Sequence, residues 1–504
     1  MDNIFLYNGI CKDIKTKGEK TMKNAKIVIL FLVVCHLLTA CQAKNANQTE
    51  DKNNRSPTDN IEDTEPTASY YDVLGKRDFS GDTFTILDAV HSPDVHINVA
   101  LEITGEPIND ALFKRDKFIE DTYNVNINYV QIVGNGPGCS SLEKSVKAGM
   151  REYDLIVSYV LGSGLSTIVP RQVLYNMIDA PYLSLQSPWW SKMLYENMQY
   201  NHKLFYSSGD IYLPTFSQGP MNMMYNKNVF KNHGLEDNLY QLVFDGKWTL
   251  DVLEKLIKDT DLDLNSDGKM HAKDDFYGIT YANLPEYMFG FLAGAGVKTS
   301  EVTGDGELAM TLNTPLTIAK IQKLSSMLEP IKYSDIQDPP LVTFQEGRAM
   351  FLATCMIVPT WLRGMADDFG ILPQPKWDEN QKSYVSYLNG WGNGYVGIPA
   401  NADIDKSAFV TEAMAYAGYE MLREPVYEIT LSAKVSRDEE SARIIDIIIE
   451  TAFADLGSVY NFGGTQDIIV QAILNNKDFV SAYEKSEPKI QKDIEKFIAS
   501  WTSE

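Results

Sequence analysis

The sequence predicts an α/β protein whose folded part divides into two lobes. Strand and helix patterns alternate between residues 84 and 159, an order typical of a parallel sheet covered by helices. Strand patterns return near residues 369–373 and 394–398, far along the chain from the first set. The chain beyond residue 78 is also too long for one hydrophobic core, because cores stop growing beyond about 250–300 residues.

The first half of this prediction follows the chain in order. A strand is predicted for 84–88, and a helix with its N-cap near Asn109 follows it. Residues 125–129 alternate apolar and polar side chains as a half-buried strand does. A second helix is predicted for 141–150, and the apolar run 154–159 is typical of a buried strand.

The middle of the chain is more helical. Thr249 is a predicted N-cap, and Trp248 before it is placed to pack against Leu253. A long helix is predicted for about 406–423, with a mainly helical tail beyond it. The glycines at 134–138 are interrupted by a proline and lack the final glycine of a dinucleotide-binding loop, so we predict a surface loop there.

The N-terminal region has the pattern of an export signal. Two lysines after Met22 precede an apolar run at 27–38, and small residues lead to Cys41. The run is shorter than the roughly 20 residues of a membrane span. It resembles the lipobox of bacterial lipoproteins, which implies that 1–40 are removed and Cys41 becomes a lipidated first residue. The alternative is a signal anchor with a chance cysteine.

A linker is predicted for 41–78, because its polar composition cannot bury enough surface to fold. The body would then be held at the extracytoplasmic face of the cell membrane through the lipid anchor alone. The net charge of −23 opposes binding to nucleic acid, where affinity comes from clustered Lys and Arg. Cys139 and Cys355 are expected to be buried thiols, although one bridge between them is conceivable.

Motifs for catalysis are weak in this sequence. No phosphate-binding lysine loop and no His-Glu-x-x-His helix occurs, so we expect no enzyme and no catalytic cofactor. A carboxylate pair suited to glycoside hydrolysis stays open, because 68 acidic residues make such pairs common. The rival hypothesis is therefore an exported carbohydrate-active enzyme.

A loop at 263–274 has the spacing of a calcium-binding loop. Asp263, Asn265, Asp267, the Lys269 carbonyl and Asp274 take the ligand positions, and a glycine takes the sixth. Position 12 is Asp rather than the bidentate Glu, and a strand pattern replaces the second flanking helix. A structural calcium site is predicted, with a metal-free Asn/Asp/Gly turn as the alternative.

Several motifs together resemble bacterial extracellular solute-binding proteins, the substrate-capturing subunits of ABC sugar importers. Their shared order carries the resemblance more than any one of them. They are Gly105–Ala111, Tyr153–Val157, Met224–Phe230, Trp248-Thr249, Phe344–Met350, Phe369–Pro373 and Gly397–Pro399.

The resemblance implies a two-lobe periplasmic-binding-protein-like fold, each lobe a mainly parallel sheet flanked by helices, with hinge crossings between the lobes. The motif order places 79–207 and 384–430 in the N-terminal lobe, and 208–383 and 431–504 in the C-terminal lobe. The implied function is capture of a carbohydrate, an oligosaccharide by the number of aromatic residues, for delivery to ABC permease subunits. A monomer is expected. A binder of peptides or another solute is the remaining alternative.

Candidate ligand contacts are aromatic rings, which match the C–H faces of a sugar, and polar groups, which match its hydroxyls. They lie at strand ends and in loops, or match the family's motif positions. They are Trp361, Arg363, Tyr225, Trp391, Tyr395, Asp88, His91, Tyr159 and Asp210. Trp189 and Trp190 are instead predicted to pack at a helix start.

Overall fold

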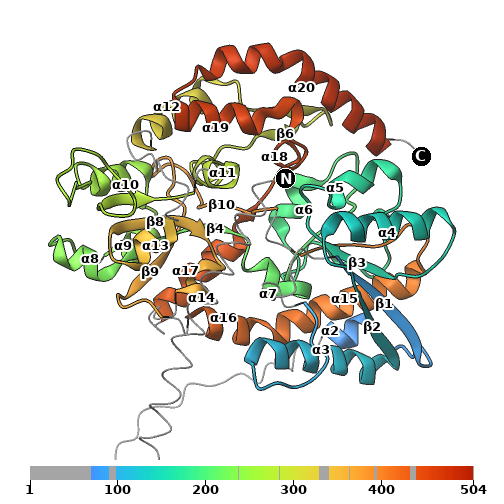
Figure 1. The fold of residues 1–504 in the computed structure, drawn as a ribbon. Helices are drawn as coiled ribbons and strands as arrows, with labels where there is room; N and C mark the ends of the chain where they lie inside the picture. The colour runs from blue at the N-terminus through green and yellow to red at the C-terminus, as the bar shows by residue number, and fades with distance from the viewer. Residues whose placement is uncertain are drawn as a thin grey trace, which may run out of the picture. The chain divides into compact units, whose positions relative to one another are not determined.

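The computed structural model describes residues 70–89, 98–236, 238–282, 284–328, 340–362, 364–390, 394–431 and 439–502. These residues form a single compact unit that contains two four-stranded sheets. Figure 1 shows the two sheets side by side with helices around each. We call the residues packed around them the first lobe and the second lobe.

The sheet of the first lobe has the strand order β11-β3-β1-β2. Its strands are β1 (Asp82–Ala89), β2 (Val125–Gln131), β3 (Leu155–Ser158) and β11 (Tyr395–Gly397). β1 is parallel to β2 and to β3, while β11 joins the edge antiparallel to β3. The late segment around residue 395 thus returns to the sheet that the first strands build.

Helices α3 (Pro107–Tyr123), α4 (Asn135–Lys147) and α15 (Ile404–Met421) cover this sheet. The prediction of a surface loop at 134–138 is wrong, because these residues open α4. A Cβ on Gly138 would lie 2.1 Å from the Cβ of Ala89, so the glycine allows the helix to approach β1 closely. Smaller helices of this lobe are α5 (Leu165–Ile168), η1 (Val169–Arg171) and α6 (Lys192–Met198).

The sheet of the second lobe has the order β5-β8-β4-β9. Its strands are β5 (Tyr277–Thr280), β8 (Ala349–Cys355), β4 (Met221–Asn226) and β9 (Phe369–Pro373). β5 and β8 are parallel, and β4 runs antiparallel to both of its neighbours, β8 and β9. Each sheet therefore has three strands in one direction and one reversed strand, which is at the edge in the first lobe and internal in the second.

Helices of the second lobe follow its strands closely. They are α8 (Lys227–Asn232), α9 (Leu239–Phe244), α10 (Leu250–Ile257), α11 (Pro285–Gly294), α12 (Pro315–Leu328), α13 (Pro340–Gln345), α14 (Val358–Trp361) and α17 (Glu439–Glu450). A hairpin of β6 (Ser300–Val302) and β7 (Leu308–Met310) accompanies them. Thr249 caps α10 as predicted, and the fully buried Trp248 donates its indole N–H to the carbonyl oxygen of Pro373 at 2.9 Å.

Three connections join the lobes. The first contains η2 (Asp210–Tyr212) and α7 (Leu213–Phe216), the second contains β10 (Ser386–Tyr387), and the third contains α16 (Arg423–Leu431). β10 pairs in parallel with β12 (Ala452–Phe453), and Leu388 bridges to Pro220. The second connection therefore hydrogen-bonds to the end of the first connection as well as linking the sheets.

The C-terminal tail consists of α18 (Leu456–Tyr460), η4 (Phe462–Gly464), α19 (Thr465–Asn475) and α20 (Phe479–Thr502). α19 packs against α11 and α12 of the second lobe, and α20 packs against α19 and also against η1 of the first lobe. The resemblance implies that 431–504 belong to the second lobe. In the structure, α20 also contacts the first lobe.

Helix α2 (Tyr70–Leu74) lies within the range 41–78 that the sequence predicted as linker. The ring of Tyr70 packs against Trp189 and Tyr416 with centroids 4.5 and 5.1 Å apart. The end of the predicted linker is therefore part of the folded unit. Residues 1–69, with the predicted signal and Cys41, lie outside the described residues.

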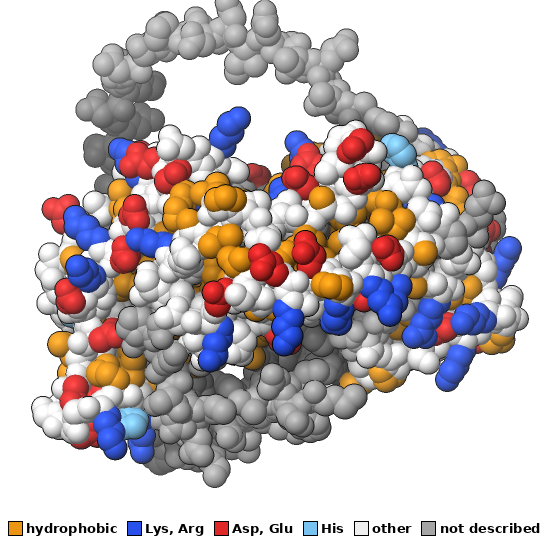
Figure 2. All heavy atoms as spheres, turned by 90° about the horizontal axis from the view of Figure 1, so that it is seen from above, with side chains coloured by type: hydrophobic (Ala, Val, Ile, Leu, Met, Phe, Trp, Pro, Cys, Tyr) orange, Lys and Arg blue, Asp and Glu red, His pale blue; other side chains and the backbone are white. Residues whose placement is uncertain are grey.

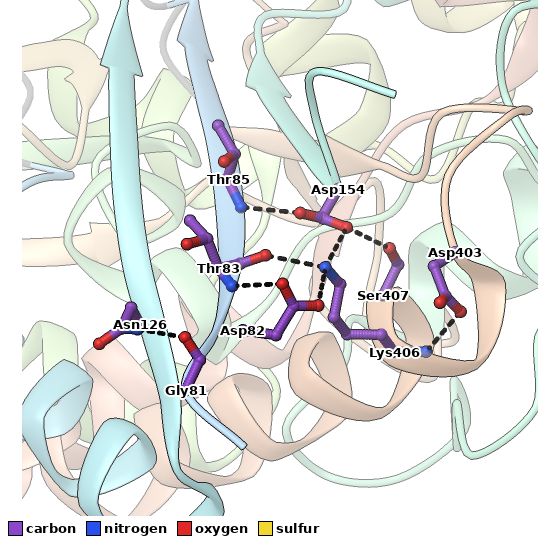
Figure 3. A network of polar contacts seen from close by, with 9 residues as sticks. All are labelled: Gly81, Asp82, Thr83, Thr85, Asn126, Asp154, Asp403, Lys406 and Ser407. Atoms are coloured by element: carbon purple, nitrogen blue, oxygen red, sulfur yellow. Dashed lines mark hydrogen bonds and ion pairs between the residues drawn. The ribbon is translucent and has the colours of Figure 1, made fainter. Parts of the chain in front are cut away.

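Lys406 near the start of α15 ties the returning chain to the first sheet (Figure 3). Its ammonium group donates to Asp82 at 2.9 Å and to the carbonyl of Thr83 at 2.8 Å, and lies 3.3 Å from Asp154. Asp154 in turn accepts the backbone N–H of Thr85 at 2.8 Å. One partly buried cation thus joins β1, the start of β3 and α15.

Among the described helices, none has both the length and the apolar composition that crossing a membrane requires.

Candidate functional site

Asp88 lies at the carboxyl end of β1, the edge where α/β sheets place ligands, and it is 2% exposed. Its carboxylate accepts hydrogen bonds from the amide groups of Asn98 at 3.2 Å and Gln131 at 3.0 Å. Burial raises the pKa of Asp88, and the two amide donors oppose this shift. The group is therefore held by neutral partners inside the protein and presents almost no surface.

The Asp88 network extends to the first lobe connection. The side-chain oxygen of Asn98 accepts the hydroxyl of Thr215 in α7 at 3.1 Å. A chain of hydrogen bonds thus runs from the end of β1 to the connection between the lobes. Sequence reasoning missed Asn98 and Gln131. The signal for Gln131 was available, since it ends the strand that pairs in parallel with β1 and lies opposite Asp88 in the register.

Asp210 lies in the first connection, in η2, and is 2% exposed. It forms an ion pair with Arg423 at the start of α16, 2.8 Å from the guanidinium Nε. Burial raises the pKa of Asp210 to about 6, although the neighbouring Arg423 lowers it. The ion pair joins the first and third connections, so the structure gives this carboxylate a structural partner at the hinge.

Three candidate tyrosines lie inside the protein. Tyr159 is 2% exposed, and Tyr225 and Tyr395 are 1% exposed. The ring of Tyr225 packs against Phe230 with centroids 5.2 Å apart, and the ring of Tyr395 lies 5.9 Å from that of Tyr206. These rings therefore present almost no face to a ligand in this arrangement of the lobes.

Trp361 differs from these tyrosines. It ends α14, which follows β8 in the second lobe, and its side chain is half-buried. α14 packs against α16, the helix of the third connection. Trp361 thus combines the incomplete burial of a large aromatic residue with a position beside a segment that joins the lobes. His91, Arg363 and Trp391 lie outside the described residues.

Trp189 and Trp190 have a role that the sequence only partly indicated. Both are buried, and their indole N–H groups donate to the two carboxylate oxygens of Glu412, each at 2.9 Å. Tyr70 donates its hydroxyl to the same carboxylate at 2.9 Å. Burial raises the pKa of Glu412, while these donors oppose the shift. The cluster joins α2, α15 and the segment before α6, and it is structural.

The loop at 263–274 folds around its own backbone. Asp263 accepts the backbone N–H groups of Ser266 at 2.7 Å and Gly268 at 2.8 Å, and Asp267 accepts that of Lys269 at 2.8 Å. Gly268 has the positive φ of +79° that the sharp turn requires. No group of three or more His, Cys, Asp or Glu side chains in the described residues is arranged to hold a metal ion. Calcium binding through Asp263, Asn265, Asp267, Lys269 and Asp274 stays a prediction.

Cys139 and Cys355 are both buried, and no disulfide joins them. Burial raises the pKa of the Cys139 thiol to about 11, so it is protonated at neutral pH.

Comparison with solved structures identifies the fold. A cyclo/maltodextrin-binding protein complexed with maltotetraose is similar over 83% of this chain and 99% of its own, with a TM-score of 0.56 and 13% identity. The GacH receptor of Streptomyces glaucescens, solved unliganded and with acarbose, is similar over 82% of this chain and 99% of its own, with a TM-score of 0.51 and 13% identity. No family model matches the sequence, and no curated protein does.

These similarities confirm the predicted α/β class and the two-lobe fold of the solute-binding proteins.

Proposed function

We propose that this protein is the solute-binding component of an ABC importer and that it captures an oligosaccharide between its two lobes. The observation that carries the proposal is the fold, which spans nearly the whole length of two carbohydrate-binding proteins. The first was solved with maltotetraose, and the second both unliganded and with acarbose or an acarbose homolog. The connections between the lobes are the expected hinge. Binding without chemical change fits the motif analysis and the two binding proteins of the same fold.

Trp361 is the first candidate for stacking on a sugar ring. Sugars bury their C–H faces on aromatic side chains, and tryptophan supplies the largest such face. Among the nine candidates, the described ones other than Trp361 are each at most 2% exposed, whereas Trp361 is only half-buried. Closure of the lobes around a ligand would bring α14 and the segments beside α16 onto the sugar.

The test is calorimetric titration with linear and cyclic α-glucan oligosaccharides. The expected result is saturable binding of one of them, with a loss of about tenfold or more in affinity in Trp361→Ala. Trp377→Ala is the matched control, because Trp377 is also a half-buried tryptophan of the second lobe, packed beside the ammonium group of Lys320. Its affinity should stay within about twofold of the wild type. Equal losses in both variants would refute the role of Trp361.

A second experiment separates binding from catalysis. The titration should give one ligand bound per protein, and the oligosaccharide should be recovered unchanged after incubation with the protein. Sustained release of shorter sugars would overturn the proposal in favour of a carbohydrate-active enzyme. Binding of peptides but of no sugar would favour a different solute.

The remaining parts of the proposal come from the sequence. We propose lipidation at Cys41, location at the extracytoplasmic face of the cell membrane, a monomeric state and delivery to permease subunits that supply ATP hydrolysis. Metabolic labelling with a fatty acid, compared between wild type and Cys41→Ala, tests the anchor. Labelling that persists in the variant would contradict it.

A further inference from the structure

We propose that the C-terminal segment 456–502 is a strap that holds the two lobes together and limits how far they separate. The segment contacts both lobes, and its interior is closely packed. The proposal rests on the hinged capture proposed above, but it concerns the movement of the lobes rather than the ligand.

The first end of the strap is fixed to the second lobe. Asp455 caps α18, and its fully buried carboxylate accepts the backbone N–H of Thr299 at 2.6 Å and that of Ser300, in β6, at 3.4 Å. The hydroxyl of Ser300 accepts the backbone N–H of Gly457 at 2.7 Å. α19 then packs along α11 and α12, as Figure 1 shows. Because charge-assisted hydrogen bonds are the stronger kind, this end is firmly attached.

The other end reaches the first lobe through aromatic rings. The ring of Phe497 lies 5.7 Å from that of Tyr200, and the ring of Trp501 lies 4.9 Å from that of Phe205, both edge to face. Tyr460 of α18, near the start of the strap, also contacts the first lobe, because its hydroxyl accepts that of Tyr206 at 3.3 Å. Edge-to-face ring pairs attract each other beyond the burial of their surfaces, so this end is cohesive.

Residues 200–206 are an integral part of the first lobe. Ser207, which follows them, exchanges backbone hydrogen bonds with Val396 of β11 at 3.0 and 2.8 Å. The carbonyl of Leu204 accepts the backbone N–H of Met177 at 2.8 Å. The strap therefore contacts a segment that extends the edge of the first sheet, and a force on its rings is passed to that sheet.

The interior of the strap is too closely packed to stretch. Phe497 also packs against Tyr460, with centroids 4.7 Å apart. A Cβ on Gly463 would lie 2.2 Å from Cγ1 of Ile490, and the backbone N–H of Gly463 donates to Asp493 at 3.1 Å. Separation of the lobes must consequently break the contacts of the strap with one of the lobes, and the contacts with residues 200–206 are the ones that release.

The apolar side chains of α20 are buried within the same molecule, and its outward face is polar. Its buried side chains form one stripe, from Phe479 to Trp501, while Lys485, Lys489 and Lys492 are exposed. Figure 2 shows this side of the molecule, with basic and acidic side chains interspersed. The apolar face of the helix is therefore already used by the contacts described above.

The experiment compares Phe205→Ala with Phe479→Ala in the full chain without ligand. Phe205 meets the strap from the first lobe, whereas Phe479 pairs with Tyr483 on α20 at 5.7 Å and makes no described ring contact with the first lobe. Small-angle X-ray scattering gives the radius of gyration, and hydrogen exchange gives the protection of residues 200–206 and of α11 and α12.

Phe205→Ala is expected to increase the radius of gyration, and to raise the hydrogen-exchange rates of residues 200–206 at least about threefold. The protection of α11 and α12 should stay unchanged. Phe479→Ala should leave the radius and the exchange of 200–206 at wild-type values. Equal behaviour of the two variants, or no change in either, would overturn the strap. Tyr206→Phe, which removes only the hydroxyl contact with Tyr460, tests the attachment of α18 to the same first-lobe segment with little risk to folding and should shift both readouts in the same direction.

Ligand binding supplies a readout that separates the two proposals. A looser pair of lobes populates the closed form less, so the Kd of Phe205→Ala for a bound oligosaccharide should rise about threefold or more. If no sugar binds the wild type, the function proposed above fails, while the scattering and exchange results still decide the strap.

Discussion

The buried carboxylate of Glu412 offers the sharpest test of how the first lobe is held together. Its two oxygens accept the indole N–H groups of Trp189 and Trp190 and the hydroxyl of Tyr70, each at 2.9 Å, and the residue is fully buried. In Glu412→Gln, one oxygen becomes an NH₂ group that faces an N–H donor. The shape of the side chain is kept, and only its hydrogen-bonding capacity changes.

The magnitude follows from these contacts. A hydrogen bond to a charged group contributes about 1.5–3 kcal/mol, and a buried donor left without an acceptor costs about 1–3 kcal/mol. Removing the charge offsets part of this loss, because burial of a carboxylate is itself unfavourable. The expected net decrease in the free energy of unfolding for Glu412→Gln is about 2–4 kcal/mol.

The assay is urea unfolding at pH 8, followed by circular dichroism and by tryptophan fluorescence. Glu420→Gln is the matched control, because Glu420 lies two turns further along α15 and is exposed. The free energy of unfolding of Glu420→Gln should stay within about 0.5 kcal/mol of the wild-type value. The reasoning fails if Glu412→Gln is no more destabilising than this control.

Three further predictions concern other buried or charged groups. Because the pKa of Asp210 is raised to about 6, this group stabilises the folded state most below its unfolded pKa of 3.8, and the contribution is lost as the pH rises to about 6. The stability of the wild type relative to Asp210→Asn should therefore fall by up to about 3 kcal/mol between pH 4 and pH 7, and equal pH profiles in urea unfolding would contradict it. Lys406→Met should lower the free energy of unfolding by about 1–3 kcal/mol, because it leaves Asp154 without its cation, and a change below 0.5 kcal/mol would refute this. If the 263–274 loop holds calcium, CaCl₂ should raise Tm in the wild type and not in Asp263→Asn, with MgCl₂ and EDTA as controls; equal melting curves with and without calcium would reject the site.

Local patterns predicted most of the first sheet and its helices. The strands around residues 84–88, 125–129 and 154–159 are present, because each pairs an apolar run with clear flanking signals. Thr249 was recognisable as a helix cap for the same reason. Residues 134–138 were misassigned, since the requirement for Gly138 comes from a close contact with Ala89, a residue far away in the sequence.

The candidate site was harder to predict because exposure is a tertiary property. Tyr225 and Tyr395 match the composition of a sugar cleft, yet both are buried, with Phe230 and Tyr206 packed against them. Asp210 has the chemistry of a ligand contact, but its partner Arg423 lies more than two hundred positions further along the chain. No periodicity in one sequence indicates such a pair. Trp361 was marked by its place after the Phe344–Met350 motif of the resembled family, and its role as a ligand contact stays a prediction.

The two described cysteines place one concealed thiol in each half of the protein. Cys139 lies in α4, and Cys355 ends β8. A thiol reagent added during slow denaturation would modify each only when its surroundings come apart, and peptide mass mapping would tell the two events apart. The order of modification would then reveal whether the halves melt in concert or one after the other, with no engineered probe in the molecule.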